Sequence, residues 1–398
     1  MPYGPEWRLN RRIQTSLLST RACEAYCILQ DIGSKQLSYE MLTADNFTTP
    51  CHRFTSTVAF ALAYGGGLRT HYNQAKELKD IDELTSLGFQ AVSIGSFLVD
   101  IFPILDRVPI FFSSWKKSAE QIHENMRQKF TKLYDVALQD QTWNWARQAL
   151  KKSETQDLSH EQRAFSIGEL YLGVTHSNHI VLEVFVMASI LHQSAVQQAQ
   201  QELDSVIGSQ RLPLFEDATK LPYVNAFITE ILRWCPVLPL GFPHRVSTDD
   251  EYMGYKIPSN SIIFTNQWQM NMDEKFFDNP DCFEPERWIQ NPDLPLSAFG
   301  FGRRSCPGEC FARYTLFIAI SRLLWAFNIT GSNKDDLAHE KAAKESGRLG
   351  VLYRPSSFGA RFQIRSSEHE RVIKLDRAVA DEERMRALEA IGKTLFSE

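Results

Sequence analysis

The chain has no apolar run that reaches the roughly 20 residues a membrane-spanning helix needs. Its first residues also lack the charged-then-apolar pattern of a secretory signal. A strong charge of either sign is missing too, since 48 acidic and 43 basic residues leave a net charge of −5, which indicates neither a nucleic-acid partner nor an acidic tail. What remains is a composition with 43% hydrophobic residues, which predicts a globular domain with a large core.

Cysteine is scarce as well. The seven cysteines are an odd number and lie far apart, in a chain of 398 residues that is too long to depend on disulfides for its stability. We therefore expect reduced thiols and a protein that faces the cytosol.

Helical periodicity dominates the first half of the chain. Apolar residues recur every three or four positions from about residue 8 to residue 207. The stretch from Phe165 to Val206 is apolar nearly all round in its middle, which predicts one buried central helix. Two short strands about a turn are expected between Arg245 and Phe264. The sequence thus predicts a mainly α fold with a small β part, and the alternating charges of residues 368–398 predict a solvated terminal helix.

The most informative segment is residues 299–308, Phe-Gly-Phe-Gly-Arg-Arg-Ser-Cys-Pro-Gly. Its glycines suit a tight loop that approaches a flat ligand closely, and Pro307 suits the first turn of a following helix. Cys306 would then lie at a helix N-terminus, where the dipole and the backbone N–H groups lower the pKa of a thiol. An anionic sulfur of this kind can serve as the axial ligand of a haem iron.

This segment resembles the haem-binding loop of the cytochrome P-450 family, whose fixed positions are filled by Phe299, Gly300, Gly302, Arg304, Cys306 and Gly308. The resemblance implies a helix-rich haem-thiolate fold with Cys306 as the metal ligand. It also implies that Phe299, Gly308 and Arg304 contribute to haem binding, Arg304 by pairing with a propionate. A dinucleotide-binding loop is the nearest other interpretation, but Ser305 stands in place of its third glycine and no strand precedes the loop.

Two further motifs occur in the order that the family requires. Glu230 and Arg233 are three residues apart on an expected helix and can pair, and Arg287 follows in a Pro-Glu-Arg-Trp segment. They resemble the family's Glu-Arg-Arg network, which implies a structural role for a partly buried ion network beneath the haem.

Three other residues resemble the family's propionate contacts. Trp7 and Arg11 match its Trp-x-x-x-Arg helix, and Arg245 lies where another propionate contact is usual. The alternative is that these basic residues are solvated surface charges.

The central helix departs from the family pattern. Family members carry an acid and an alcohol that relay protons to bound dioxygen, and His176 and Ser177 occupy these two places here. A positioned proton relay is worth ~10²–10⁴ in rate, so the loss of the acid could slow the oxidation. His176 titrates near neutrality and could replace the acid, or it is simply a polar helix residue.

The resemblance covers the chain from Trp7 to about Arg365, without the anchor, first sheet and pocket loop that precede the Trp-x-x-x-Arg helix in the family. We expect an N-terminally truncated haem-thiolate oxygenase domain at residues 1–367 and a charged C-terminal extension at residues 368–398. The apolar segment from Phe97 to Phe112 resembles the part of membrane-bound members that dips into a bilayer, although a core role is an equal alternative.

Residues 221–226 and 239–245 make the chain most similar to fungal secondary-metabolite members of the family. The leading hypothesis is a monooxygenase that oxidises an apolar small molecule with O₂, using haem and electrons from an NADPH-dependent flavoprotein reductase. By resemblance it would work at the cytosolic face of the endoplasmic reticulum, in peripheral contact with the membrane, or in the cytoplasm because no anchor is present. A haem-thiolate isomerase or dehydratase without O₂ activation, a catalytically impaired truncated form and a haem- or partner-binding protein without turnover stay open as alternatives.

Overall fold

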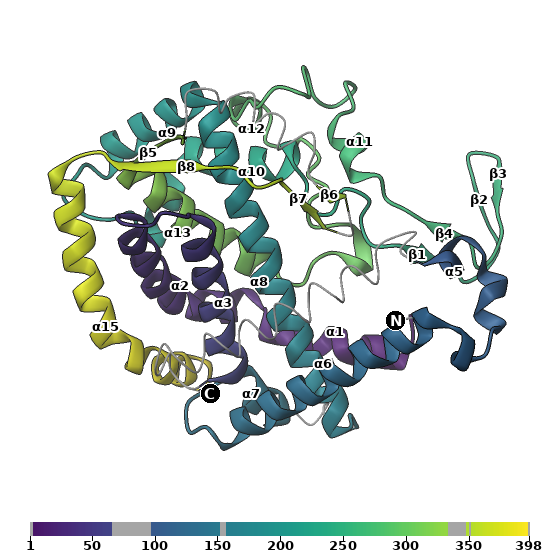
Figure 1. The fold of residues 1–398 in the computed structure, drawn as a ribbon. Coiled ribbons are helices and arrows are strands. Elements are labelled where there is room, and N and C mark those ends of the chain that lie inside the picture. The colour runs from purple at the N-terminus through teal and green to yellow at the C-terminus, as the bar shows by residue number, and fades with distance from the viewer. Residues whose placement is uncertain (1–2, 66–96, 152–156, 333–347, 350–351, 397–398) are drawn as a thin grey trace.

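The computed structural model describes residues 3–65, 97–151, 157–332, 348–349 and 352–396. Long helices build the body of the molecule (Figure 1). They are α1 (Pro5–Leu17), α2 (Thr20–Met41), α3 (Thr48–Tyr64), α6 (Ser114–Gln139), α8 (His160–Leu191), α9 (Gln193–Val206), α10 (Pro222–Trp234), α13 (Glu309–Ala326) and α15 (Ser367–Phe396). Shorter turns of α-helix are α5 (Leu98–Ile101), α7 (Trp145–Lys151), α11 (Gln267–Asn271) and α12 (Glu286–Gln290).

The strands are short and pair antiparallel. β1 (His244–Arg245) pairs with β4 (Ile262–Ile263), and β2 (Asp250–Tyr252) pairs with β3 (Tyr255–Ile257). β5 (Phe327–Gly331) pairs with β8 (Ala360–Ile364), and β6 (Arg348–Leu349) pairs with β7 (Tyr353–Arg354). The prediction of a mainly α fold with a small β part is therefore confirmed.

The β2–β3 hairpin turns at Met253 and Gly254, which both have positive φ, at 52° and 83°. That pair of angles belongs to the tight turn whose twist matches the twist of two antiparallel strands. The strand after the hairpin, β4, pairs back to β1 and not to β3, which the sequence pattern did not indicate.

Helix α8 is the central element, and α3, α6 and α13 pack around it. Its start is fixed by Ser159 and Gln162, which cap each other's backbone N–H groups. It meets the length and hydropathy of a membrane span, but most of it is buried inside the protein, as in the core helix of a globular domain.

The prediction of a single helix from Phe165 to Val206 is wrong at one position. The backbone leaves the helical conformation at His192, and the chain restarts as α9. No proline or glycine marks this break. The His192 ring instead stacks on Phe283 of the distant Pro-rich segment, at 4.9 Å between ring centroids, so a tertiary contact accompanies the break.

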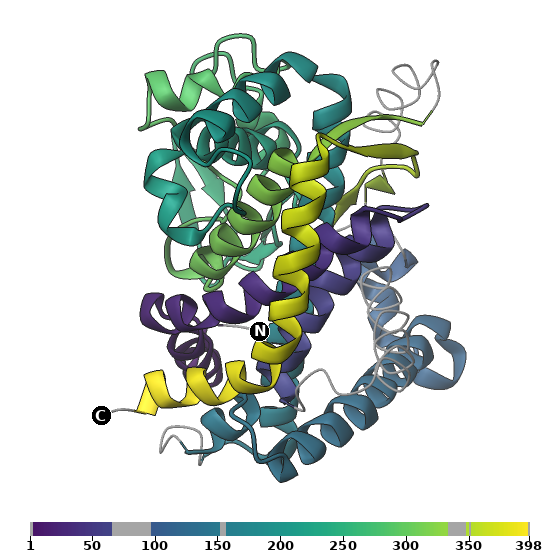
Figure 2. The ribbon, with the colours of Figure 1, turned by 90° about the vertical axis from the view of Figure 1, so that its left-hand side faces the viewer.

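The C-terminal segment is a helix, as predicted, but it is not solvated all round. Figure 2 shows α15 running along the body of the protein, where it packs on α2. Its buried face consists of Val372, Ile373, Ala380, Ala387, Leu388 and Ile391. The dense charges of residues 368–398 hid this apolar stripe in the sequence.

Candidate haem-binding site

The Cys306 loop is a compact turn that leads into α13. The backbone N–H of Cys306 donates to the carbonyl of Phe299 at 2.7 Å, which closes the loop. Gly300 and Gly302 adopt φ values of 71° and 55°, and a left-handed backbone of this kind favours glycine. Helix α13 begins at Glu309, so Pro307 precedes the helix and does not occupy its first turn as predicted.

Cys306 is an exposed residue, although the protein around it removes part of the water from its thiol. Burial raises the pKa of the Cys306 thiol, and the charge of Glu309 adds to this effect. The Gly308 N–H and the charge of Arg11 act in the opposite direction but do not prevail. A backbone N–H at the helix terminus lowers this pKa as predicted, but the predicted net lowering is wrong, because desolvation outweighs that hydrogen bond.

Trp7, Arg11 and Arg304 gather beside this thiol. The Arg304 guanidinium lies over the Trp7 ring, 4.3 Å from its centroid. Arg11, one helical turn after Trp7, lies close enough to Cys306 and Arg304 for their charges to act on it. Burial lowers the pKa of Arg11, and the neighbouring Arg304 charge lowers it further. Two close cations of this kind favour an anionic group between them.

Gly302 in the loop and Gly173 on α8 both have open backbone surfaces, since a Cβ atom added to either would meet no atom within 4 Å. The Cys306 thiol, the two neighbouring arginines and the open loop backbone at Gly302 fit a planar ligand with acidic groups at its edge. The residues present therefore suit a haem with its propionates.

Ser177 lies one turn after Gly173 on α8, and its hydroxyl donates to the Gly173 carbonyl at 2.6 Å. His176 faces a different neighbour. Its ring centroid is 6.5 Å from that of His52 on α3, and the His52 centroid is 5.1 Å from that of His179.

His179 continues this row into a buried ion pair. Its Nε2 lies 3.2 Å from Glu183, which also accepts from Arg354 at 2.6 Å. Burial lowers the pKa of His179. Burial alone would raise the pKa of Glu183, but the hydrogen bonds from His179 and Arg354 hold it below its usual range. No sequence motif indicated this cluster.

Glu230, Arg233 and Arg287 form one buried network. Arg233 donates twice to the Glu230 carboxylate, at 2.8 and 2.7 Å, and Arg287 Nε donates at 3.2 Å. The Arg233 guanidinium also donates to the carbonyls of Asn271, Pro280 and Cys282. The Glu230–Arg233 pair thereby connects α10 to the Pro-rich segment that precedes the Cys306 loop.

Trp288 is a member of the network that the sequence reasoning missed. Its indole Nε1 donates to Glu230 at 2.8 Å. Its position next to Arg287 was the only available signal, because a buried indole N–H requires an acceptor.

The other predicted residues lie as follows. Phe299 is half-buried, and Arg313 lies over its ring at 5.1 Å. A Cβ on Gly308 would lie 3.8 Å from the Cys306 sulfur, which is ordinary contact. Arg245 in β1 is exposed and donates through Nε to Asn260 at 2.9 Å, and no recorded contact joins it to Trp7, Arg11 or Arg304 within the described residues.

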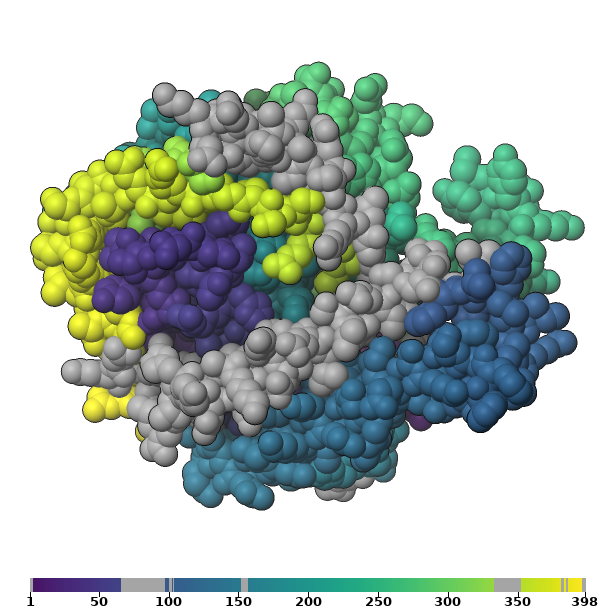
Figure 3. Space-filling model, in the orientation of Figure 1, coloured from purple at the N-terminus to yellow at the C-terminus, as the bar shows by residue number. Residues whose placement is uncertain are grey.

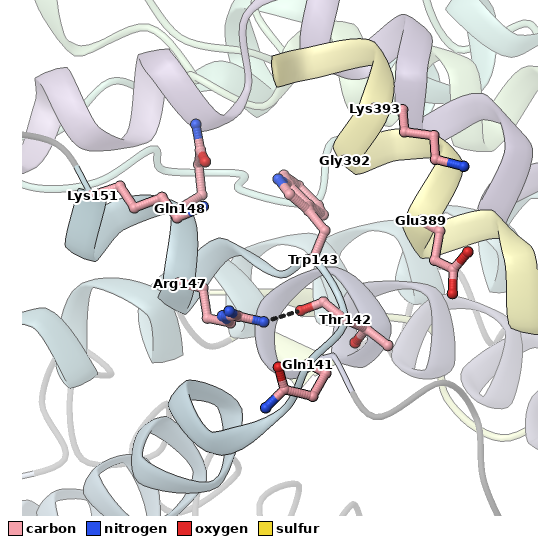
Figure 4. A pocket seen from close by; sticks show the side chains of 9 residues that line it. All are labelled: Gln141, Thr142, Trp143, Arg147, Gln148, Lys151, Glu389, Gly392 and Lys393. Carbon is pink, nitrogen blue, oxygen red and sulfur yellow. Dashed lines mark hydrogen bonds between the residues drawn. The ribbon is translucent and has the colours of Figure 1, made fainter. Parts of the chain in front are cut away.

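A separate pocket of about 330 Å³ lies between α7 and α15 (Figure 4). Arg147, Lys151, Lys393 and Glu389 are among its lining residues, and none of the lining residues belongs to the Cys306 loop or to α8. This pocket is not part of the site.

Comparison with known proteins identifies the family of the chain. The family model "Cytochrome P450" matches residues 1–356. The chain is 38% identical to cytochrome P450 monooxygenase aneD of Aspergillus aculeatus, over 98% of this chain and 77% of that protein. It is 33% identical to fumitremorgin C synthase of Aspergillus fumigatus, over 95% of this chain and 74% of that protein. A zebrafish cytochrome P450 solved with progesterone superposes with a TM-score of 0.75, at 21% identity over 91% of this chain and 83% of that one.

Replacing Glu230 by Gln should destabilise the protein by about 3–5 kcal/mol, because two buried guanidinium groups lose their counter-charge. The free energy of unfolding in urea measures this loss. Glu284→Gln is the matched control, since its half-exposed carboxylate also pairs with Arg287 and should cost less than about 1 kcal/mol. Equal losses in the two variants would contradict a central role for Glu230.

Proposed function

Because this chain belongs to the cytochrome P450 family, we propose that Cys306 supplies the axial thiolate of its haem. The protein is a haem-thiolate monooxygenase of secondary metabolism, as are its curated fungal relatives. The observation that carries the residue assignment is the exposed Cys306 sulfur beside Arg11 and Arg304. The names of the relatives do not favour the isomerase or dehydratase alternative.

When bound, the haem would supply the chemistry of dioxygen activation, which electron donation from a thiolate ligand favours. The chain's own residues hold and orient the group. Arg304, stacked on Trp7, and Arg11 would pair with propionates, and Arg245 would reach a further one after releasing Asn260. Phe299 and Gly308 hold the thiol through the loop hydrogen bond and the Gly308 N–H. The Glu230, Arg233 and Arg287 network keeps the segment before the loop in place.

The surrounding protein raises the pKa of the Cys306 thiol, so in this proposal the positive iron centre provides most of the drive for its ionisation. A carbon monoxide difference spectrum of the dithionite-reduced protein should show the Soret position of a thiolate-ligated haem. Cys306→Ala should lose that position. The assignment fails if the thiolate-type band persists in Cys306→Ala.

We further propose that an NADPH-dependent flavoprotein reductase supplies the electrons. Arg8, Arg12 and Arg303 are exposed. Arg8 and Arg303 both lie 5.5 Å from the centre of the Tyr3 ring, so these two arginines form one basic patch beside the Cys306 loop. Such a patch suits an acidic partner. Arg303→Glu should slow reduction by NADPH and reductase and leave reduction by dithionite unchanged. An unchanged rate with both reductants would remove this patch from the proposal.

His176 and Ser177 are proposed to carry protons to the oxygen-binding face of α8. The three rings lie in the order His176, His52, His179, and the row ends at the Glu183–Arg354 pair. The Arg354 side chain is 55% exposed and so meets solvent. Where the ring nitrogens do not meet directly, bridging waters would carry the proton between rings whose centroids are 5.1 and 6.5 Å apart. Ser177 lies on another face of α8, so water would also have to carry the proton to its oxygen, which retains acceptor capacity.

His176→Phe should lower the turnover number by about 10²-fold, because proton transfer is then interrupted. More of the NADPH should be consumed without product, while the carbon monoxide spectrum stays unchanged. His160→Phe, at the exposed start of the same helix, is the control and should retain full coupling of NADPH to product. Full coupling in His176→Phe would leave the histidine as a packing residue.

The protein is also proposed to work at the cytosolic face of the endoplasmic reticulum. Leu98, Phe102, Ile104, Phe111 and Phe112 are each more than half exposed, which favours a bilayer contact over a core role for the described part of residues 97–112. Figure 3 shows the segment at one end of the molecule. Replacing Phe111 and Phe112 by Ser should abolish cosedimentation with phosphatidylcholine vesicles, and retained binding would count against this contact.

A further inference from the structure

Helices α2 and α13 meet in a fixed register. Gln30 of α2 donates to the Phe311 carbonyl at 3.2 Å and to the Thr315 hydroxyl at 2.7 Å. Further along, Arg322 of α13 donates to Ser34 at 2.7 Å and pairs with Asp31. Both helices therefore run in the same direction, and the residues before Gln30 lie beside the residues before Phe311.

Three of the seven cysteines fall at this end of the interface. Cys23 and Cys27 are one turn apart on α2, and Cys310 is in the first turn of α13. The Cys23 and Cys310 thiols lie within hydrogen-bonding reach of each other. We propose that Cys23 and Cys310 form a reversible disulfide that joins α2 to the helix that follows the Cys306 loop.

The two thiols have different surroundings, which assigns their roles. Cys23 is 0% exposed, whereas Cys310 is half-buried and can be reached by a small oxidant. Burial raises the pKa of both thiols, and the contact between them offsets part of that rise at Cys310 but adds to it at Cys23. Cys310 is therefore the thiol that is oxidised first, and Cys23 is the thiol that resolves the resulting sulfenic acid.

The chemistry balances with hydrogen peroxide as the two-electron oxidant. The Cys310 thiolate attacks one peroxide oxygen and, with one proton taken up, becomes a sulfenic acid while water leaves. The Cys23 thiol then attacks the Cys310 sulfur, its proton goes to the leaving hydroxide, and a second water forms. Overall, two thiols and one peroxide give one disulfide and two waters.

Burial raises the pKa of both thiols, so little thiolate is present near neutrality and the reaction is slow. Position makes it selective. Cys51 is buried in α3 and Cys282 is exposed, and no recorded interaction joins either thiol to another cysteine within the described residues.

The consequence would act on the haem-binding region. Cys310 lies four residues after Cys306, so a link to Cys23 holds the first turn of α13 against α2. The chain between the two sulfurs contains most of the domain, and such a long closed loop restricts the unfolded state strongly. The oxidised protein should therefore unfold at a higher temperature than the reduced protein.

The experiment treats the purified holoprotein with hydrogen peroxide over hours, blocks the remaining thiols by alkylation and maps the peptides by mass spectrometry. A cross-linked peptide that contains residues 23 and 310, lighter by about 2 Da than the two reduced peptides together, is expected. Dithiothreitol should restore both thiols. The midpoint of thermal unfolding should rise on oxidation and fall back on reduction.

Matched variants decide the pairing. Cys282→Ser should still form the link, and Cys23→Ala and Cys310→Ser should each abolish it. Should Cys23→Ala fail to fold, Cys310→Ser at the half-buried position provides the same test. A cross-link between residues 27 and 310 in the wild type would overturn the pairing. Oxidation of Cys282 with Cys23 and Cys310 still reduced would overturn the proposal itself.

Discussion

The arrangement of the Cys306 region depends on one buried carboxylate. Glu230 is fully buried and accepts hydrogen bonds from Arg233, Arg287, Trp288 and the backbone N–H of Glu284. A charge so far from water is stable only when each of its lone pairs is satisfied. The donors come from α10, α12 and the irregular segment between them. That segment has little regular structure of its own, so this ion network, more than any helix or sheet, fixes its path toward the loop.

The central helix separates two kinds of surface. Gly173 and Ser177 lie one turn apart on the side that is open, whereas His176, His179 and Glu183 face α3 and β7. A helix places residues three or four apart on one face, so two adjacent residues lie on different faces and contact different neighbours. His176 and Ser177 are adjacent in the sequence yet contact different parts of the protein.

The sequence predicted those parts of the site that depend on local chemistry. The glycine and cysteine spacing of residues 299–308, the Glu230–Arg233 spacing and the Trp7–Arg11 spacing each describe one turn or loop, and the family resemblance joined them. Contacts between distant segments were not predictable. The break at His192 accompanies its stack on Phe283, and the position of Trp288 depends on a carboxylate 58 residues earlier. The pKa of Cys306 was also misjudged, because a dipole can be read from sequence but desolvation depends on the finished fold.

The position of α15 on α2 has a consequence for biosynthesis. Helix α15 is translated long after α2, which it covers, with Leu388 and Ile391 in its buried face. The apolar side of α2 consequently lacks this cover until residues 367–396 have left the ribosome. Nascent chains with exposed apolar surface aggregate readily and occupy chaperones. The docking of α15 on α2 is therefore a late step in the folding of this domain.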